Sequence, residues 1–161
     1  MSRWRPPGER SSPYITLQGY QNLERELATL WSKRRIVNDA LSAAAAEGDR
    51  SENAEYIYRK KEQAGIDRRI RYIQKRLPDL KVVSSIASKD RVFFGAWVTV
   101  SLNNAATEYR IVGADEADSL NNLISVDSPL ARALLKKAVD DEFKVNVQGT
   151  ESIGYIEAIR Y

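Results

Sequence analysis

The chain has 161 residues and a formal net charge of +3, from 25 Lys and Arg against 22 Asp and Glu. It contains no histidine and no cysteine, which excludes Ser-His-Asp and Cys-His nucleophiles, thiolate or imidazole zinc sites and disulfide bonds. Any chemistry must therefore use carboxylates, hydroxyls, Lys or Arg. No apolar run reaches the roughly 18 residues of a membrane span, and the first residues lack the apolar core of a signal peptide. We therefore expect a cytoplasmic protein with no membrane partner.

Residues 1–13 have the composition of a disordered tail. They hold three of the five prolines together with Gly, Ser and Arg. Such a segment cannot bury enough apolar surface to offset the entropy that is lost on ordering it. We therefore expect folded structure to begin at residue 14.

The next segment, 14–80, has the pattern of two helices. Thr16 can cap a helix over 17–46, because its hydroxyl can accept a hydrogen bond from the free amides of the first turn. Positions 20, 23, 27, 30, 34, 37, 41 and 44 alternate steps of three and four and, apart from Arg34, carry apolar or aromatic side chains. In the second half, positions 66, 70, 73, 77 and 80 are Ile or Leu at the same spacing. The two stretches predict an antiparallel coiled-coil hairpin.

The stretch 47–51 decides between a hairpin and one long helix. Gly48, followed by Asp49 and Ser51, is a signal for a helix to stop and restart, which favours the hairpin. A helix over 17–46 is roughly 45 Å long. The turn is therefore expected at the far end of the hairpin.

From residue 81 to residue 161 the pattern changes to short strands. One short helix is expected after Asp127 and Ser128, because Pro129 suits a first helical position and Leu130 begins an apolar face. The expected fold class is α+β, a helical hairpin followed by a small β-rich domain with one short helix. The candidate strands lie over 92–100, 108–112, 123–126, 144–147 and 155–159.

The turn of the hairpin carries two carboxylates, Asp49 and Glu52. One interpretation is a paired site for a divalent cation, because neighbouring carboxylates supply the oxygen ligands that Mg²⁺ prefers. The alternative is structural, with Asp49 as the N-cap and Glu52 at the third helical position of a capping box. Both can hold, because a capping carboxylate keeps further lone pairs. Two exposed carboxylates bind Mg²⁺ weakly, so a partner would have to supply the other ligands.

The second helix is strongly basic. Between Tyr56 and Arg76 there are eight Lys and Arg and two carboxylates, a local charge of +6. Such a run is commonly a solvated helix face. Beside a carboxylate pair it also suits the phosphates of a bound strand in a metal-assisted phosphodiester reaction. The cations nearest the turn are Arg59, Lys60 and Lys61, with Arg68, Arg69 and Arg71 further back.

The turn and its surroundings resemble a known family. Residues 48–56, Gly-Asp-Arg-Ser-Glu-Asn-Ala-Glu-Tyr, are similar to the GD-x-x-EN-A-x-Y tip signature of the Gre transcript cleavage factors of bacterial RNA polymerase. The GreB branch in particular is resembled by residues 66–72 and, in the second domain, by 92–98, 109–113 and 124–137. The resemblance extends over residues 14–161.

The resemblance implies an accessory factor rather than an enzyme. Such factors insert their coiled coil into the secondary channel of RNA polymerase and stimulate cleavage of the 3′ end of backtracked nascent RNA. Asp49 and Glu52, which match the tip acids of the family, would help hold a Mg²⁺ ion shared with the polymerase, with no cofactor in the isolated protein. The residues that would guide the RNA 3′ end are Arg59, Lys60, Lys61, Arg68 and Arg69.

The second domain, FKBP-like in this family, would dock on the rim of the secondary channel. Asp127, Ser128 and Pro129 match the contact segment of the family.

Two features depart from the family pattern. Asp140-Asp141 stands where Gly-Asp is usual, which leaves the turn conformation there open, and residues 1–13 are not a usual part of the family.

Two other functions remain open. A Gre homologue can occupy the same channel and inhibit or modulate transcription without cleavage, although such proteins often change the tip acids and both are present here. Alternatively, the β-rich domain is a working prolyl isomerase with an aromatic pocket, although aromatic residues on strands are more often core. The candidate pocket residues are Phe93, Phe94, Trp97, Tyr109 and Tyr155.

Overall fold

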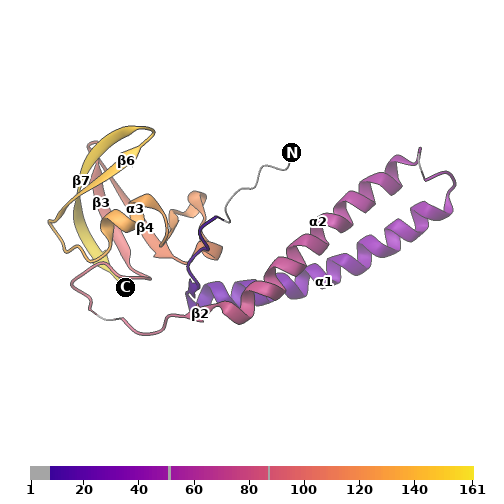
Figure 1. Cartoon of the computed structure of the whole chain (residues 1–161), viewed down its shortest axis with the longest axis horizontal. Helices are drawn as coiled ribbons and strands as arrows, with labels where there is room; N and C mark the ends of the chain where they lie inside the picture. The colour runs from indigo at the N-terminus through magenta and orange to yellow at the C-terminus, as the bar shows by residue number, and fades with distance from the viewer. Residues whose placement is uncertain (1–7, 51, 87) are drawn as a thin grey trace. The chain divides into compact units, whose positions relative to one another are not determined.

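The computed structural model describes residues 8–50, 52–86 and 88–161. The chain divides into two compact units. The hairpin unit is Tyr20–Leu80, and the β unit combines Lys81–Tyr161 with the chain up to Gly19. A helical hairpin and a β-rich unit with one short α-helix are both present (Figure 1), so the expected α+β fold class is confirmed. Within the described residues, no helix has the length and apolar character needed to cross a membrane.

The hairpin consists of α1 (Leu17–Ala46) and α2 (Ala54–Arg76), which run antiparallel in Figure 1. The bounds of α1 coincide with the predicted helix over 17–46. Thr16 caps it as predicted, because its Oγ1 accepts a hydrogen bond from the Gly19 amide at 3.0 Å. The single long helix is ruled out, since the chain leaves the helix between α1 and α2. A 3₁₀ turn, η1 (Leu77–Asp79), follows α2.

The contact between α1 and α2 follows the predicted spacing of apolar residues. All eight expected positions on α1 are buried or half-buried, and so are the corresponding positions 56, 59, 63, 66, 70, 73, 77 and 80. At the centre, Val37 of α1 packs with Ile66 and Ile70 of α2. The seam is thus apolar around Val37, Ile66 and Ile70, as the sequence predicts, and more polar nearer the turn, where it includes Arg59 and Gln63.

Polar pairs join the two helices beside this seam. Arg34, the exception in the α1 series, does not break the seam, because its Nε donates to Asp67 Oδ1 of α2 at 2.6 Å. Further along, Arg69 of α2 pairs with Glu26 of α1 at 2.6 Å. Each pair allows a charged side chain to lie at the edge of the seam with a partner for its charge.

The β unit is built on a five-stranded sheet with strand order β5-β4-β3-β7-β6. Neighbouring strands are antiparallel, except β4 and β5, which are parallel. The helix α3 (Pro129–Leu134) packs against one face, with Ala131 and Leu134 in the same core as Phe143 and Ile156. The strands are β3 (Trp97–Leu102), β4 (Ala105–Val112), β5 (Leu123–Ser125), β6 (Glu142–Val147) and β7 (Thr150–Arg160).

All five predicted strands form, but the first begins later than the sequence predicts. Instead of extending from residue 92, the chain turns at Phe93–Ala96, where the Ala96 amide donates to the Phe93 carbonyl at 3.1 Å. Gly95 has a φ of 87° there, a region that glycine reaches without a clash of Cβ. The turns at 103–104 and 148–149 also have positive φ, which suits tight β-hairpins and lets pairing continue to the strand ends.

Asp140, where glycine is usual in the family, adopts a left-handed backbone. Its φ is 69°, and Asp is one of the few residues besides glycine that tolerate this region. Asp141 supports the turn, because its Oδ2 accepts a hydrogen bond from the Ala138 amide at 2.8 Å. The turn therefore accommodates the aspartate.

Two short strands bring together the segments that precede α1 and follow α2. β1 (Tyr14–Ile15) pairs in parallel with β2 (Lys81–Val82), a pairing the sequence does not indicate. A parallel pair needs a long connection, and here the whole hairpin supplies it. For this reason residues 14–19 group with the β unit, whereas the sequence assigns them to the domain 14–80. Of the expected tail 1–13, residues 1–7 lie outside the described residues.

Glu116, in the 3₁₀ turn η2 (Ala114–Glu116), anchors the start of α1. Its carboxylate accepts hydrogen bonds from the Thr16 amide at 3.0 Å, from the Thr16 hydroxyl and from the Gly113 amide at 2.9 Å. A Cβ on Gly19 would lie 2.1 Å from Glu116 Oε1, so a larger residue there would displace the Glu116 side chain. A second 3₁₀ turn, η3 (Ser119–Asn121), follows η2.

Replacing Ile70 by Ala should destabilise the hairpin, because Ile70 is only 4% exposed and its loss leaves a cavity in a thin seam. We expect the free energy of unfolding to fall by about 2–4 kcal/mol in urea titrations followed by far-ultraviolet circular dichroism. Ile36→Ala is the matched control, since Ile36 is 68% exposed, and it should change this free energy by less than about 0.5 kcal/mol. Equal losses in the two variants would contradict the assigned seam.

Candidate functional site at the hairpin tip

The side chain of Asn53 joins the two helix ends that flank the turn between α1 and α2. Its Oδ1 accepts a hydrogen bond from the Tyr56 amide at 3.1 Å, which caps the N-terminus of α2. Its Nδ2 donates at 2.7 Å to the Ala44 carbonyl in the last turn of α1, which also accepts a hydrogen bond from the Glu47 amide at 3.3 Å. One amide group therefore ties the two helix ends together.

This arrangement corrects the capping-box interpretation of Asp49 and Glu52. Because α2 begins at Ala54, its N-cap is Asn53 and its third helical position is Tyr56. Asp49 and Glu52 both precede the cap and are exposed residues of the turn. The capping role that the sequence allowed for Asp49 thus belongs to Asn53.

The donor set at the turn suits a magnesium ion but is partial. Asp49 and Glu52 carry carboxylate oxygens, the hard ligands that Mg²⁺ prefers. In the described part of the chain, no group of three or more acidic side chains gathers to hold a metal ion. Two carboxylates would fill only part of the octahedral coordination shell of Mg²⁺.

Two cations flank Tyr56 beside the turn. The guanidinium carbon of Arg50 lies 5.5 Å from the centroid of the Tyr56 ring, and Lys60 Nζ lies 5.6 Å from it. Lys60 Nζ also donates to the Tyr56 hydroxyl at 3.4 Å. Contacts of this kind contribute about 0.5–1 kcal/mol at exposed sites. They hold positive charge at the base of the turn.

Two of the predicted RNA-guiding residues are engaged in ion pairs. Arg59 binds Glu55 Oε1 at 2.8 Å and Glu62 Oε2 at 3.0 Å. These hydrogen bonds, first to Glu55 and then to Glu62, raise the pKa of the Arg59 guanidinium above its ordinary value. Arg69 donates from Nε and Nη2 to the two carboxylate oxygens of Glu26 at 2.6 and 3.0 Å.

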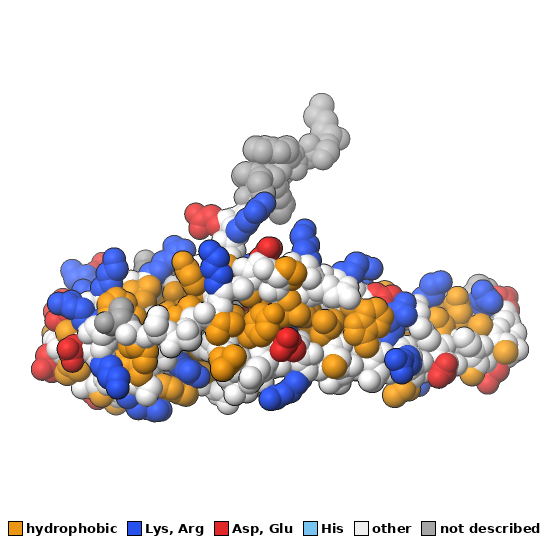
Figure 2. Space-filling model, turned by 90° about the horizontal axis from the view of Figure 1, so that it is seen from below, with side chains coloured by type: hydrophobic (Ala, Val, Ile, Leu, Met, Phe, Trp, Pro, Cys, Tyr) orange, Lys and Arg blue, Asp and Glu red, His pale blue; other side chains and the backbone are white. Residues whose placement is uncertain are grey.

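The remaining predicted cations lie on the exposed surface of α2, where Lys60 also contacts Tyr56. Lys60, Lys61 and Arg68 are all exposed residues. On the face drawn in Figure 2, Lys and Arg side chains are spread along the hairpin among hydrophobic and acidic ones and do not form one continuous patch. On this face the basic side chains of the hairpin are therefore separate from one another.

The predicted docking segment forms the start of α3. Ser128 is the N-cap, because its Oγ accepts a hydrogen bond from the Ala131 amide at 3.3 Å, and Pro129 takes the first helical position as expected. Asp127, just before the cap, is half-buried. Its carboxylate accepts from the Ser12 amide at 2.8 Å and from the Ser12 hydroxyl. The N-terminal segment thus reaches the residue expected to contact the partner.

The aromatic residues proposed for an isomerase pocket lie on different faces of the sheet. Trp97 pairs with Arg110 and Arg160 on the neighbouring strands, and both guanidinium groups lie over its ring, at 5.4 and 4.5 Å from the centroid. Tyr109 pairs with Val98 and packs against the core. Successive residues of a strand point to opposite faces, so Trp97 and Tyr109 cannot line one pocket.

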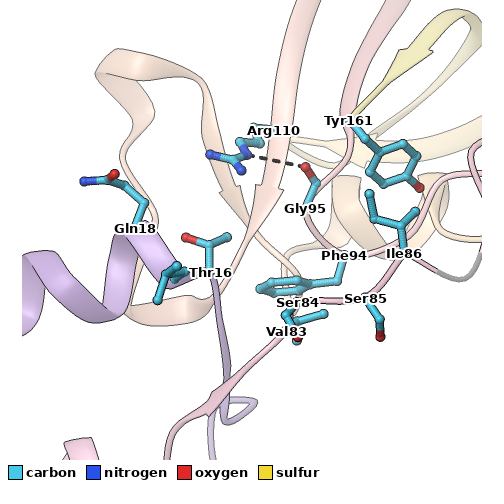
Figure 3. A pocket seen from close by; sticks show the side chains of 11 residues that line it. Thr16, Gln18, Val83, Ser84, Ser85, Ile86, Phe94, Gly95, Arg110 and Tyr161 are labelled. Carbon is cyan, nitrogen blue, oxygen red and sulfur yellow. Dashed lines mark hydrogen bonds between the residues drawn. The ribbon is translucent and has the colours of Figure 1, made fainter.

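The β unit has a hollow of about 260 Å³ (Figure 3), and its lining also argues against an aromatic isomerase pocket. Of the five aromatic candidates, its lining among the described residues includes Phe94 alone. Arg110 lies at its edge, where Nε donates to the Gly95 carbonyl at 3.4 Å, and Ile86 and Tyr161 line its other side. The isomerase interpretation is therefore not supported by the arrangement of its residues.

Three residues that the sequence did not single out hold these sites in place. Asn53 carried a local signal, because Asn is a preferred N-cap residue and Ala54 begins a helical stretch. Glu116 and Ser12 carried none. They bind residues that are 100 and 115 positions away along the chain, so no local pattern marks them.

Both units of the chain match known protein families. Residues 13–82 match the family model described as transcription elongation factor, N-terminal, and residues 87–161 match transcription elongation factor, GreA/GreB, C-terminal. The chain is 52% identical over 167 residues to the transcription elongation factor GreB of Xanthomonas axonopodis pv. citri, and 51% identical over 164 residues to that of Pseudomonas aeruginosa. Each match covers 100% of this chain and 98% of the relative, so residues 1–13 are included.

Solved structures with a similar fold are more distant. The crystal structure of the GreA factor homolog 1 (Gfh1) protein of Thermus thermophilus is 21% identical and covers 94% of this chain and 100% of that chain. Its TM-score is 0.44, which is too low to support any conclusion about the site.

Replacing Asn53 by Ala removes both the cap of α2 and the bond to α1. We expect the free energy of unfolding of the hairpin to fall by about 1–2 kcal/mol, and the Tyr56 amide to exchange its hydrogen faster. Asn53→Asp keeps the cap acceptor and removes the donor to Ala44, so it should lose only part of this stability. Urea unfolding and hydrogen exchange followed by mass spectrometry measure both effects.

Gln74→Ala is the control for the Asn53 variants, because it removes an exposed amide from the same helix. It should leave the exchange of the Tyr56 amide unchanged. If Asn53→Ala behaved like Gln74→Ala, Asn53 would have no part in closing the turn.

Proposed function

Since the chain belongs to the GreA/GreB family of transcription elongation factors, we propose that it inserts its helical hairpin into the secondary channel of bacterial RNA polymerase and stimulates cleavage of the 3′ end of backtracked nascent RNA. In this proposal it is an accessory factor that acts in the cytoplasm. The polymerase supplies the catalytic core, and the chain supplies the tip.

One observation carries the proposal: the two tip acids are exposed residues of the turn, and Asn53 ties together the two helix ends beside them. Asn53 closes the turn, while Asp49 and Glu52 lie outside the cap at the end of a helix of 30 residues. Such a helix is about 45 Å long, which is enough to carry the turn into a deep channel. The hairpin therefore suits the delivery of two carboxylates to a remote site.

Asp49 and Glu52 would hold a Mg²⁺ ion together with ligands from the polymerase. Once bound, the ion would lower the pKa of a coordinated water and offset the charge that develops on the cleaved phosphodiester. The role of this chain would be to bring two carboxylates to that site and to keep them oriented. The bonds of Asn53 to both helix ends serve that orientation.

The cations of α2 would guide the extruded RNA 3′ end by contacts with its phosphates. Arg59, Lys60, Lys61, Arg68 and Arg69 form the proposed path. Lys61 and Arg68 can be altered without breaking a known ion pair of the hairpin, whereas Arg59 and Arg69 also bind carboxylates. Lys61 and Arg68 are therefore the most informative positions for a test of RNA guidance.

The segment of Asp127, Ser128 and Pro129 would contact the rim of the secondary channel. Ser128 and Pro129 fix the backbone at the start of α3, and this holds Asp127 at the edge of the β unit. A carboxylate in that position suits a cationic side chain on the polymerase. Nucleic acid is an unsuitable partner for it, because phosphates repel a carboxylate.

The double variant Asp49→Asn with Glu52→Gln should lose RNA cleavage while retaining polymerase binding. The substitutions keep side-chain size and remove both charges, so stimulation should fall on the order of 100-fold or more. The measurement is Mg²⁺-dependent release of short 3′ RNA fragments from halted complexes on a backtracked template. Asp39→Asn, at an exposed position of α1, is the matched control and should cleave normally.

Unchanged cleavage by the double variant would rule out the assignment of the tip. If the unaltered chain inhibited transcription without any cleavage, the chain would be a secondary-channel regulator of the other kind that the sequence left open. Loss of polymerase binding together with cleavage would mean that the substitutions act on docking and not on the reaction.

Charge reversal at Lys61 and Arg68 should weaken cleavage more in deeply backtracked complexes, which extrude long RNA, than in shallow ones. Each lost phosphate contact should also reduce the salt dependence of the rate by about one counterion. Lys89→Glu, in an exposed loop of the β unit, is the control. Equal losses on long and short RNA would argue against a guiding role.

A further inference from the structure

We propose that Ser12 is a positioning residue for the docking carboxylate of Asp127, so that residues 8–13 are part of the polymerase-docking surface and not an inert tail. This inference rests on the proposed function, because it assumes that Asp127 contacts the polymerase. It concerns a part of the chain to which neither composition nor the family signature assigns a role.

The contact between Ser12 and Asp127 is bidentate. The Ser12 amide donates to Asp127 Oδ2 at 2.8 Å, and the Ser12 hydroxyl donates to Asp127 Oδ1. The Asp127 amide in turn donates to Ser125 Oγ at 3.1 Å. Both carboxylate oxygens and the backbone of Asp127 are therefore fixed by named donors and acceptors.

The same geometry recurs four residues further along the chain. The amide and hydroxyl of Thr16 bind the two oxygens of Glu116 as those of Ser12 bind Asp127. Between the two contacts, the Lys81 amide donates to the Pro13 carbonyl at 2.8 Å, and β1 pairs with β2. Residues 12–16 are thus held on the β unit at both ends and in the middle, which makes Ser12 a fixed donor.

The ordered carboxylate borders a polar hollow of about 320 Å³, large enough for the end of an Arg or Lys side chain. The N-terminal segment forms one side of it and the region of Asp127 the other. A cationic group of the polymerase that enters the hollow would meet a carboxylate of each segment, Glu9 and Asp127, with Arg10 and Arg132 also in the lining. The other lining residues of the hollow are Ser11, Ala114 and Ser125.

The Asp127 carboxylate can be held by Ser12 and bind a cation of the polymerase at the same time. A carboxylate accepts about four hydrogen bonds, and the Ser12 donors use one site on each oxygen. A side chain that is already fixed loses less conformational entropy when the partner binds, which strengthens binding without adding a contact. Loss of the Ser12 hydroxyl should therefore weaken docking without touching the tip acids.

The test uses the full chain with halted complexes of bacterial RNA polymerase. Ser12→Ala should raise the factor concentration that gives half-maximal cleavage by about three- to tenfold, with the maximal rate at saturation unchanged. Ser12→Thr keeps the hydroxyl and should restore the original value within about twofold. Ser119→Ala, an exposed serine of η3, is the matched control and should have no effect. Removal of residues 1–12 should weaken binding at least as much as Ser12→Ala.

The outcomes separate this inference from the proposed function. Asp127→Asn should weaken binding more strongly, and adding Ser12→Ala to it should cost little more, because the acceptor charge is already gone. If Asp127→Asn bound normally, the docking role itself would be wrong. If Asp127→Asn weakened binding but Ser12→Ala did not, only the positioning role would fail. Tighter binding after Ser12→Ala or after removal of residues 1–12 would also overturn the positioning role, because the N-terminal segment would then cover the docking site.

Discussion

The function proposed for the hairpin depends on the contact of one amide side chain with two helix ends. A two-helix hairpin has a single seam and no third layer, so its free end is open to fraying unless its terminal amides and carbonyls find partners. Asn53 provides one acceptor to α2 and one donor to α1. Asn53 thus ties the two helix ends together, and Asp49 and Glu52 are exposed residues of the turn. The residue that joins the helix ends is therefore not one of the two acids proposed to hold the metal ion.

The cations of α2 also fall into two groups: some are held in contacts with neighbouring side chains, and others are exposed to solvent. Exposed ion pairs contribute only about 0–1 kcal/mol each, so the pairs of Arg59 and Arg69 matter less for stability than for where they hold the guanidinium groups. Lys60 rests beside Tyr56, and Lys61 and Arg68 project into solvent. The local charge of +6 therefore comes from cations with different neighbours. The neighbours of each cation decide whether it can bind a phosphate without breaking another contact.

In the β unit, carboxylates hold the N-terminal segment. Glu116 and Asp127 each bind the amide and the hydroxyl of one residue, Thr16 and Ser12 respectively. Charge-assisted hydrogen bonds of this kind are stronger than neutral ones and define the direction of both partners. The segment is therefore fixed by polar contacts at defined points on either side of Ile15, whose side chain is fully buried.

The sequence by itself determined what depends on neighbours along the chain. The three-four spacing fixed the seam positions, Thr16 marked the start of α1, and Ser128 with Pro129 marked that of α3, because helix periodicity and capping act within one or two turns. The strands were also found, although the late start of β3 was missed, since a run of β-prone residues at 92–96 hides the turn that Gly95 makes.

Only the tertiary structure decided which distant groups meet. The pairing of β1 with β2, the anchor of Glu116 and the contact of Ser12 with Asp127 join residues that are far apart in sequence, where no local pattern can register them. At the tip the sequence offered Asp49 as the cap, and the structure gave that role to Asn53, because only the latter also reaches the end of α1. The acids were visible in the sequence, whereas the residue that ties the two helix ends together was defined by a contact between two helices.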